Sequence, residues 1–354
     1  MIPKDITREI ILDALREIDE NGIPKHRLST KYHLSHDGKL YPPKYVISLA
    51  KRIISGEELN ADEFSGGDES NTFLAALGFE IRGEQSFFVP QYTKQLTVST
   101  AVIYSNEVVT PSNTDRSRLL AQIIEADINT DIILLPAGYY QSKKINHREV
   151  SSLEKSIKKT LQAVGSSSLV CVGVDYRDKI DQVAYAIGLM GIVAAGRKFY
   201  ATAEERETTV TATDFMSKEN GMERTFQVNG FNCYIAVCYD CFGIRKDKIK
   251  NPGIDILLDL AHGFHKLGQG SSGDVDFARK GFAGASMQWQ IPVFGTGVFF
   301  GREVPERWPT GIMWSGAESV KDFKYADNQM QWIEKFEVTG NKENAIVYKY
   351  IVKR

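Results

Sequence analysis

The pattern that most constrains the fold is an alternation of strand-like and helix-like segments that begins near residue 95. Short runs rich in apolar and β-branched residues alternate with amphipathic stretches of helical period. Strands with helices between them favour a layered α/β domain that carries its functional residues at strand ends. The expected strands are 97–104, 131–136, 168–174, 181–194, 225–239, 254–260 and 292–296, and the expected helices are 116–125, 151–164 and 276–290.

The residues before this alternation predict a separate, mainly helical domain. Apolar residues recur at helical spacing over 10–18, and the turn Asn21-Gly22 ends that segment. Pro42 and Pro43 can open a second helix, because a proline in the first turn loses no intrahelical bond. Gly56 and Gly78 then end the second and third helices. We therefore expect a small helical domain at 1–86, a linker at 87–94 and an α/β domain at 95–354.

Composition excludes several classes of protein. The 43 Lys+Arg and 45 Asp+Glu give a net charge of -2, so the chain does not bind nucleic acid through bulk positive potential. The longest uncharged apolar stretch, 184–196, has 13 residues, whereas a membrane-spanning helix needs about 20. The first residues lack the apolar run of a signal peptide, and 4 cysteines in 354 residues do not make a disulfide framework. We expect a cytoplasmic protein with no membrane contact.

The segment 231–243 carries the strongest chemical signal. Its period-two alternation predicts a strand, and Asp240 and Gly243 end that strand in a turn. Cys238 would lie at this bend, held rigidly, which suits a nucleophilic thiolate. The alternative is an ordinary buried cysteine. A metal site is a further alternative, because Cys238 and Cys241 are followed by His262 and His265. Their spacing differs from that of most zinc sites, so we expect no metal.

Residues 96–340 resemble the nitrilase, or carbon–nitrogen hydrolase, superfamily. The resemblance rests on the turn Cys238-Tyr239-Asp240 and on Gly196-Arg197-Lys198 at a strand end. The segments 277–282, 290–295 and 311–316 follow in the family's order. The resemblance implies a four-layer αββα sandwich, an amide or nitrile as small-molecule substrate, no cofactor and a homo-oligomer.

The resemblance also implies roles for single residues. Cys238 would be the nucleophile, and Lys198 would stabilise its thiolate and the developing oxyanion, although most lysines are solvated surface residues. Glu205 or Glu207 would be the acidic residue that follows the lysine in many family members. The substrate pocket would include Ala137, Tyr139, Tyr140, Tyr239 and Asp240.

One position departs from the family pattern. The family's general-base glutamate follows a proline at the end of the second strand, and here Ala137 follows Pro136. Loss of a general base costs about 10²- to 10⁴-fold in rate. Tyr139, Tyr140 or Glu149 could substitute for it. Two interpretations stay open: a slow or altered C–N hydrolase, or a catalytically degenerate module that binds or senses a ligand.

The amino-terminal segment resembles another group. The runs 41–44 (Tyr-Pro-Pro-Lys) and 64–67 (Phe-Ser-Gly-Gly) are similar to the amino-terminal portions of McrA-type restriction endonucleases and related prokaryotic defence proteins. This resemblance implies a defence or nucleic-acid-related pathway. Four cations could face a phosphate backbone with tyrosines as stacking groups, or they could be solvated helix charges. The candidate nucleic-acid residues are Lys39, Tyr41, Lys44, Lys51 and Arg52, with Tyr45 beside them.

Overall fold

The structure is a computed structural model in which the chain divides into two compact units, 1–92 and 93–354. Each unit has its own apolar core and is described by itself. The described residues are 2–3, 5–24, 27, 29, 31–36, 39–59, 64, 67–83, 95–107, 111–142, 147–176, 180–265, 273, 277–306, 308–314, 316 and 329–354.

The first unit contains the three expected helices, α1 (Arg8–Asn21), α2 (Pro43–Ser55) and α3 (Asp68–Ala76). A proline occupies the start of α2, and Gly56 ends that helix in the left-handed region at φ 81°. A small antiparallel sheet, in the order β2-β1-β3, was not predicted, because its strands are too short to show a period. These strands are β1 (Tyr32–His36), β2 (Lys39–Tyr41) and β3 (Glu80–Gly83).

The second unit is built on one continuous 14-stranded sheet. Its main path runs in the order β10-β8-β7-β5-β4-β14-β13-β12-β11, and β6, β9, β15, β16 and β17 pair alongside it. The strands are β4 (Gln95–Ser105), β5 (Ile132–Leu134), β6 (Tyr140–Ser142), β7 (Leu169–Tyr176), β8 (Ile180–Gly188), β9 (Gly191–Arg197), β10 (Thr209–Val210), β11 (Thr225–Val228), β12 (Phe231–Val237), β13 (Ile256–Phe264), β14 (Val293–Phe300), β15 (Gly311–Ile312), β16 (Glu334–Thr339) and β17 (Asn344–Lys353).

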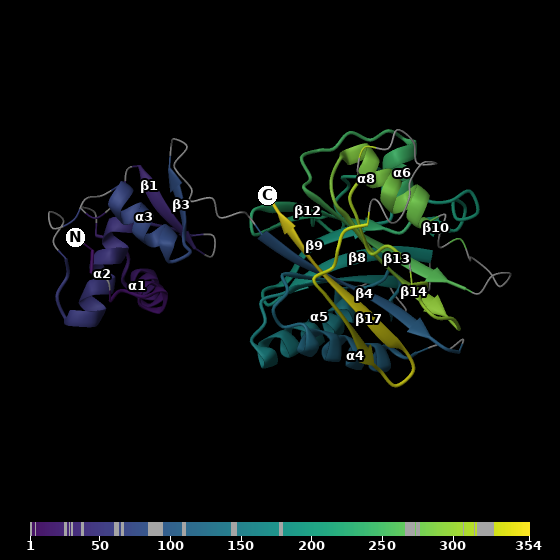
Figure 1. Cartoon of the computed structure of the whole chain (residues 1–354), viewed down its shortest axis with the longest axis horizontal. Coiled ribbons are helices and arrows are strands. Elements are labelled where there is room, and N and C mark those ends of the chain that lie inside the picture. Colours follow the sequence, from purple (N-terminus) through teal and green to yellow (C-terminus); the bar gives the residue numbers. More distant parts are fainter. Residues whose placement is uncertain are drawn as a thin grey trace. The chain divides into compact units, whose positions relative to one another are not determined.

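Helices cover the sheet on both sides, as Figure 1 shows. On one side lie α4 (Asn113–Ala126) and α5 (His147–Val164), packed on the strands through one apolar cluster. On the other side lie α6 (Asp240–Lys246) and α8 (Ala283–Trp289), packed through a second cluster. Because β12 also contacts β8 and β9, the two halves of the sheet face each other between the helix layers. The pairing of β4 with β14 joins these halves into one sheet. The expected layered α/β fold is confirmed.

Several elements differ in detail from the sequence prediction. The expected strands 181–194 and 225–239 are each a hairpin, β8–β9 and β11–β12. The second hairpin turns at Asn229 and Gly230, both with positive φ. The helix expected at 276–290 is described from 277, with the π-helical turn η2 (Ala278–Phe282) leading into α8. The strands β16 and β17 were not predicted, although β17 pairs with residues 95–104 of β4.

The direction of the strands defines one functional edge. From β12 through β13, β14, β4 and β5 to β7, every neighbouring pair is parallel. The strand β9 runs the same way as β7, because both are antiparallel to β8. The carboxyl ends of these strands therefore meet at the same edge, where α/β proteins place their ligands.

Candidate active site

Four segments converge at the carboxyl ends of these strands. Cys238 directly follows β12, and its backbone N–H donates to the carbonyl of Leu260 on β13 at 2.9 Å. Ala137 lies just beyond β5 and donates its N–H to the carbonyl of Ala261 at 3.0 Å. Lys198 directly follows β9. Residues from distant parts of the sequence thereby reach one place through backbone pairing.

Cys238 lies on the sharp turn that the sequence predicts. Its φ is 55°, in the left-handed region that residues with a side chain rarely adopt. Only 6% of the residue is exposed to solvent. The helix α6 begins two residues later, so the backbone holds the sulfur in a fixed position.

Asp240 joins the cysteine turn to the lysine segment. Its Oδ2 accepts the backbone N–H of Val237 at 3.0 Å. Its Oδ1 accepts the N–H groups of Phe199 and Tyr200 at 2.8 and 3.0 Å. The fully buried Arg224 donates to Oδ2 at 3.3 Å and also bonds the backbone carbonyl just before Lys198. These contacts make Asp240 an anchor between the two segments, and its expected place in the pocket lining stays a prediction.

Lys198 is completely buried, and its ammonium group donates to both carboxylate oxygens of Glu205 at 2.7 and 2.8 Å. Burial acts to lower the pKa of Lys198, but the nearby Cys238 and Glu205 outweigh it and raise that pKa. Burial acts to raise the pKa of Glu205, and the Lys198 charge with its hydrogen bond lowers it overall. Glu207, the other expected acidic residue, is exposed and lies outside this pair.

The charge around Cys238 favours its thiolate. Burial acts to raise the pKa of the thiol, but the Lys198 charge and the charge and hydrogen bonds of His262 lower it below its ordinary value. The other three cysteines behave oppositely. Burial raises the pKa of Cys171, of Cys233 to about 12, and of Cys241. Within one chain, the four thiols therefore differ in their readiness to ionise.

A histidine–aspartate pair, for which the sequence predicts no catalytic role, lies next to Cys238. His262 lies on β13, and its Nε2 donates to Asp175 Oδ1 on β7 at 3.2 Å. Burial acts to lower the pKa of His262, but Asp175 and Cys238 raise it to about 10. The sequence indicated His262 only as a member of a possible metal site with Cys238, Cys241 and His265, two residues beyond the expected strand 254–260. Within the described residues, no group of three or more His, Cys, Asp or Glu side chains is arranged to hold a metal ion.

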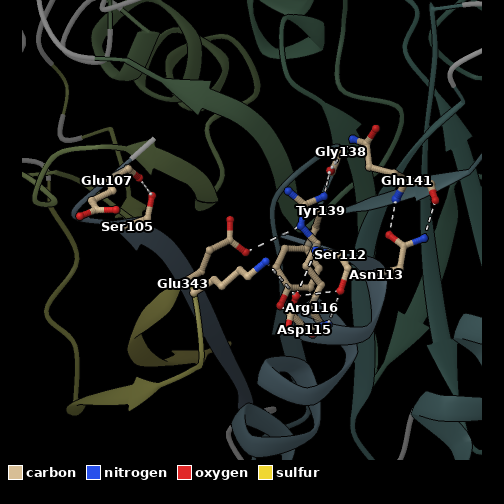
Figure 2. Close-up of polar contacts among 11 residues, drawn as sticks. Ser105, Glu107, Ser112, Asn113, Asp115, Arg116, Gly138, Tyr139, Gln141 and Glu343 are labelled. Atoms are coloured by element: carbon tan, nitrogen blue, oxygen red, sulfur yellow. Dashed lines mark hydrogen bonds and ion pairs between the residues drawn. The ribbon is translucent and has the colours of Figure 1, made fainter. Parts of the chain in front are cut away.

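Two of the expected pocket residues point elsewhere. The Tyr139 hydroxyl donates to the carbonyl of Arg116 on α4 at 2.9 Å, and the ring is buried under the helix layer (Figure 2). The Tyr140 hydroxyl pairs with Ser152 on α5 at 3.2 Å. The strand-end turn after β5 directs both side chains toward the α4–α5 side, and their role in the pocket stays a prediction. The side chain of Glu149 lies outside the described residues.

Tyr239 does lie beside the site. The Lys198 ammonium is 5.5 Å from the centre of its ring, and the ring packs against Phe242 and Phe277. Tyr239 also lines a cavity with these two phenylalanines and three cations. The cations are Arg245, Lys246 and Lys280.

In the first unit, the candidate nucleic-acid residues are occupied by internal contacts. Tyr41 and Tyr45 are buried in the core of this unit, and their role as stacking groups stays a prediction. Three of the cations pair with carboxylates, and Lys44 lies 5.2 Å from the ring centre of Phe64. The ion pairs are Lys39 with Asp19, Lys51 with Asp5, and Arg52 with Glu17 and Glu58.

One family model and several solved structures are similar to parts of this chain. Residues 4–83 match the family model of the ScoMcrA-like N-terminal head domain. The chain is similar to an amidase from Nesterenkonia sp., with 11% identity, a TM-score of 0.46, and coverage of 75% of this chain and 94% of that one. It is also similar to a CN-hydrolase superfamily protein from Xanthomonas campestris, with 10% identity, a TM-score of 0.46, and coverage of 73% and 90%.

A carbon–nitrogen hydrolase from Helicobacter pylori is similar at 12% identity and a TM-score of 0.42, with coverage of 58% of this chain and 74% of that one. These likenesses concern the fold, and the roles of single residues rest on the geometry of this chain. No curated protein matches the sequence. In the part of the chain that the structure describes, no helix is both long and apolar enough to cross a membrane.

Proposed function

We propose that the second unit is a thiol-dependent hydrolase of a C–N bond in an amide or nitrile. The observation that carries this proposal is the setting of Cys238. Its sulfur is held at a strained turn, beside a buried ammonium group, with a lowered thiol pKa. Perturbed nucleophiles of this kind cluster at active sites.

The chemistry follows from the charges. The Cys238 thiolate attacks the carbon of the C–N bond, and negative charge develops on the oxygen or nitrogen of the substrate. The Lys198 ammonium, kept protonated by Glu205, stabilises both the thiolate and that developing charge. With an amide, the nitrogen takes up a proton and leaves as ammonia or an amine, and a thioester remains. With a nitrile, the first product is a thioimidate, which adds water and loses ammonia to give the same thioester. A water molecule then hydrolyses the thioester.

The selectivity of alkylation tests the nucleophile. At neutral pH, iodoacetamide should label Cys238 faster than Cys171, because burial raises the pKa of Cys171 and lysine and histidine lower that of Cys238. The measurement is peptide mapping by mass spectrometry over time, with Cys238→Ser as control. Equal and slow labelling of both cysteines would count against the proposal.

Ammonia release from a panel of amides tests the reaction. The panel should include half-amides of dicarboxylic acids as well as neutral amides, because three cations line the cavity next to Tyr239. Turnover that Cys238→Ser abolishes supports the hydrolase.

A ligand-binding module is the second candidate, and the alanine at position 137 favours it. It predicts thermal stabilisation by a panel compound without turnover.

For the first unit, we propose nucleic-acid binding in a defence-related pathway, on the basis of its match to the head-domain family. A mobility shift of the full chain on duplex DNA should weaken steeply as salt rises. Lys39, Lys51 and Arg52 pair with carboxylates. Substituting all three should therefore weaken DNA binding less than the loss of three unpaired positive charges would. No shift even at low salt would remove this proposal.

A further inference from the structure

Building on the hydrolase proposed above, we infer that His262, oriented by Asp175, is the acid–base group that serves Cys238 in place of the missing glutamate. The pair lies outside the residues by which the sequence resembles the nitrilase superfamily. It is carried by the strand register, by hydrogen bonds and by the space around residue 138.

The register brings His262 to the sulfur. Val237 pairs with Leu260 across β12 and β13, so Cys238 and His262 follow at neighbouring strand ends. The pairing of β13 with β14 shifts between Leu260 and Gly263, which places an irregularity at His262. The charge of His262 acts on the Cys238 thiol and helps to lower its pKa, so the imidazole lies within electrostatic reach of the sulfur.

Asp175 fixes the imidazole from the other side. It engages Nε2 at 3.2 Å, which leaves Nδ1 as the ring nitrogen available to the thiol. A carboxylate on the far nitrogen sets the tautomer and stabilises the imidazolium, as in other nucleophile–base–orienter arrangements. The histidine side chain is 24% exposed, so it can exchange protons with solvent and meet a water molecule.

The turn after β5 leaves room for this pair. A Cβ at Gly138 would lie 2.6 Å from Asp175 Oδ2 and 3.1 Å from His262 Cδ2, so no larger residue fits there without displacing the pair. Arg116 holds the Gly138 carbonyl at 3.2 Å, and this contact is visible in Figure 2. The alanine that replaces the expected glutamate is thus followed by a glycine against which a histidine and an aspartate pack.

The proton transfers balance for an amide. The thiolate of Cys238 forms a bond to the carbonyl carbon, and His262 begins this step as the imidazolium. The imidazolium gives its proton to the nitrogen, the C–N bond breaks, and the amine leaves with a thioester behind. Neutral His262 then takes a proton from water, the hydroxide adds to the thioester, and the C–S bond breaks. The carboxylic acid leaves, and the thiolate and imidazolium are restored.

Five other groups influence the titration of Cys238 and His262, among them Cys241, which interacts electrostatically with Cys238. Lys198 and Asp259 interact electrostatically with Cys238, and Glu205 and Asp259 interact with His262. Asp175 is the hydrogen-bonded partner of His262. Because Lys198 remains when His262 is removed, the pH at which Cys238 ionises should rise while its thiolate stays accessible.

The test combines a pH profile with turnover in the full chain. In His262→Gln, the midpoint of the pH profile for Cys238 alkylation by iodoacetamide should move to higher pH. Ammonia release from a panel amide should fall by about 10²- to 10⁴-fold, the usual contribution of a general acid–base group. Asp175→Asn should move both readings in the same direction by less, because it removes only the group that orients the imidazole. The matched control is His265→Gln, since that ring stacks on Phe300 at 4.9 Å.

The outcomes separate the two proposals. Wild-type turnover with unchanged rate and midpoint in His262→Gln overturns the acid–base role and leaves the hydrolase standing. A shifted midpoint without any wild-type turnover removes the hydrolase and confirms only that His262 activates the thiol. If the wild type shows no turnover and the alkylation midpoint of His262→Gln does not shift, both proposals are overturned. Thermal unfolding of each variant identifies loss of fold, and in that case Asp175→Asn decides by its midpoint.

Discussion

At the scale of single residues, the charge of the buried Lys198 is balanced by Glu205. Among the described residues, this is the carboxylate that lies within hydrogen-bond distance of the ammonium group. Removing one partner of a buried pair leaves an uncompensated charge. We expect Glu205→Gln to lower the free energy of unfolding by about 3 kcal/mol, the low end of the range for buried pairs, because the Glu205 side chain is 28% exposed. Urea unfolding measures it, with the exposed Glu207→Gln as control.

The same pair should show a defined pH dependence. Folding lowers the pKa of Glu205 below its ordinary value of 4.5. Its stabilisation is therefore present above that value and is lost as pH falls through the lower folded pKa. The difference in melting temperature between the wild type and Glu205→Gln should be larger at pH 7 than in acid. A difference that grows as pH falls would contradict this assignment.

Residue chemistry was partly predictable from the sequence. Cys238 follows a segment with a clear strand period and Lys198 follows an apolar strand-like run, and the resemblance supplies their roles. His262 and Asp175 carry no local signal, because their partnership depends on which strands are neighbours. The direction of the Tyr139 side chain was likewise not predictable from the sequence. The place of Tyr139 two residues after Ala137 in the sequence does not determine which face of the sheet its side chain takes.

At the scale of elements, Asp240 links the turn after β12 to the segment after β9. It accepts three backbone N–H groups and the charge of buried Arg224. Asp240→Ala should therefore destabilise the protein by about 3–5 kcal/mol and slow alkylation of Cys238, because Lys198 and the sulfur lose their common anchor. The exposed Asp247→Ala at the end of α6 is the control. A loss below about 1 kcal/mol, a surface-like value, would show that the anchor is dispensable.

Element types were predicted better than their pairing. The strand periods of β4, β7 and β12 and the amphipathic pattern of α4 are local properties. Hairpins such as β8–β9 were merged into one strand because both arms are apolar and the turn at 189–190 contains no proline or asparagine. The pairing of β17 with β4 joins residues about 250 positions apart, and no local pattern encodes it.

At the scale of the whole molecule, the two units have separate cores. Leu74 is fully buried in the core of the first unit, whose members all precede residue 83. Leu74→Ala should cost about 2–5 kcal/mol and lower the unfolding temperature of that unit alone. Calorimetry with Cys238 alkylation as a reporter of the second unit measures it. Equal loss of both transitions would mean that the units unfold together. The homo-oligomer implied by the resemblance stays a prediction.

The backbone angle of Cys238 has a consequence for the design of inactive variants. A side chain at φ 55° is held in a sparsely populated region, at a cost of about 1–3 kcal/mol. Glycine adopts this angle freely, so Cys238→Gly should melt at a higher temperature than Cys238→Ala, the reverse of the usual ranking. Such a result would mean that keeping a sulfur atom at this bend lowers the melting temperature of the protein.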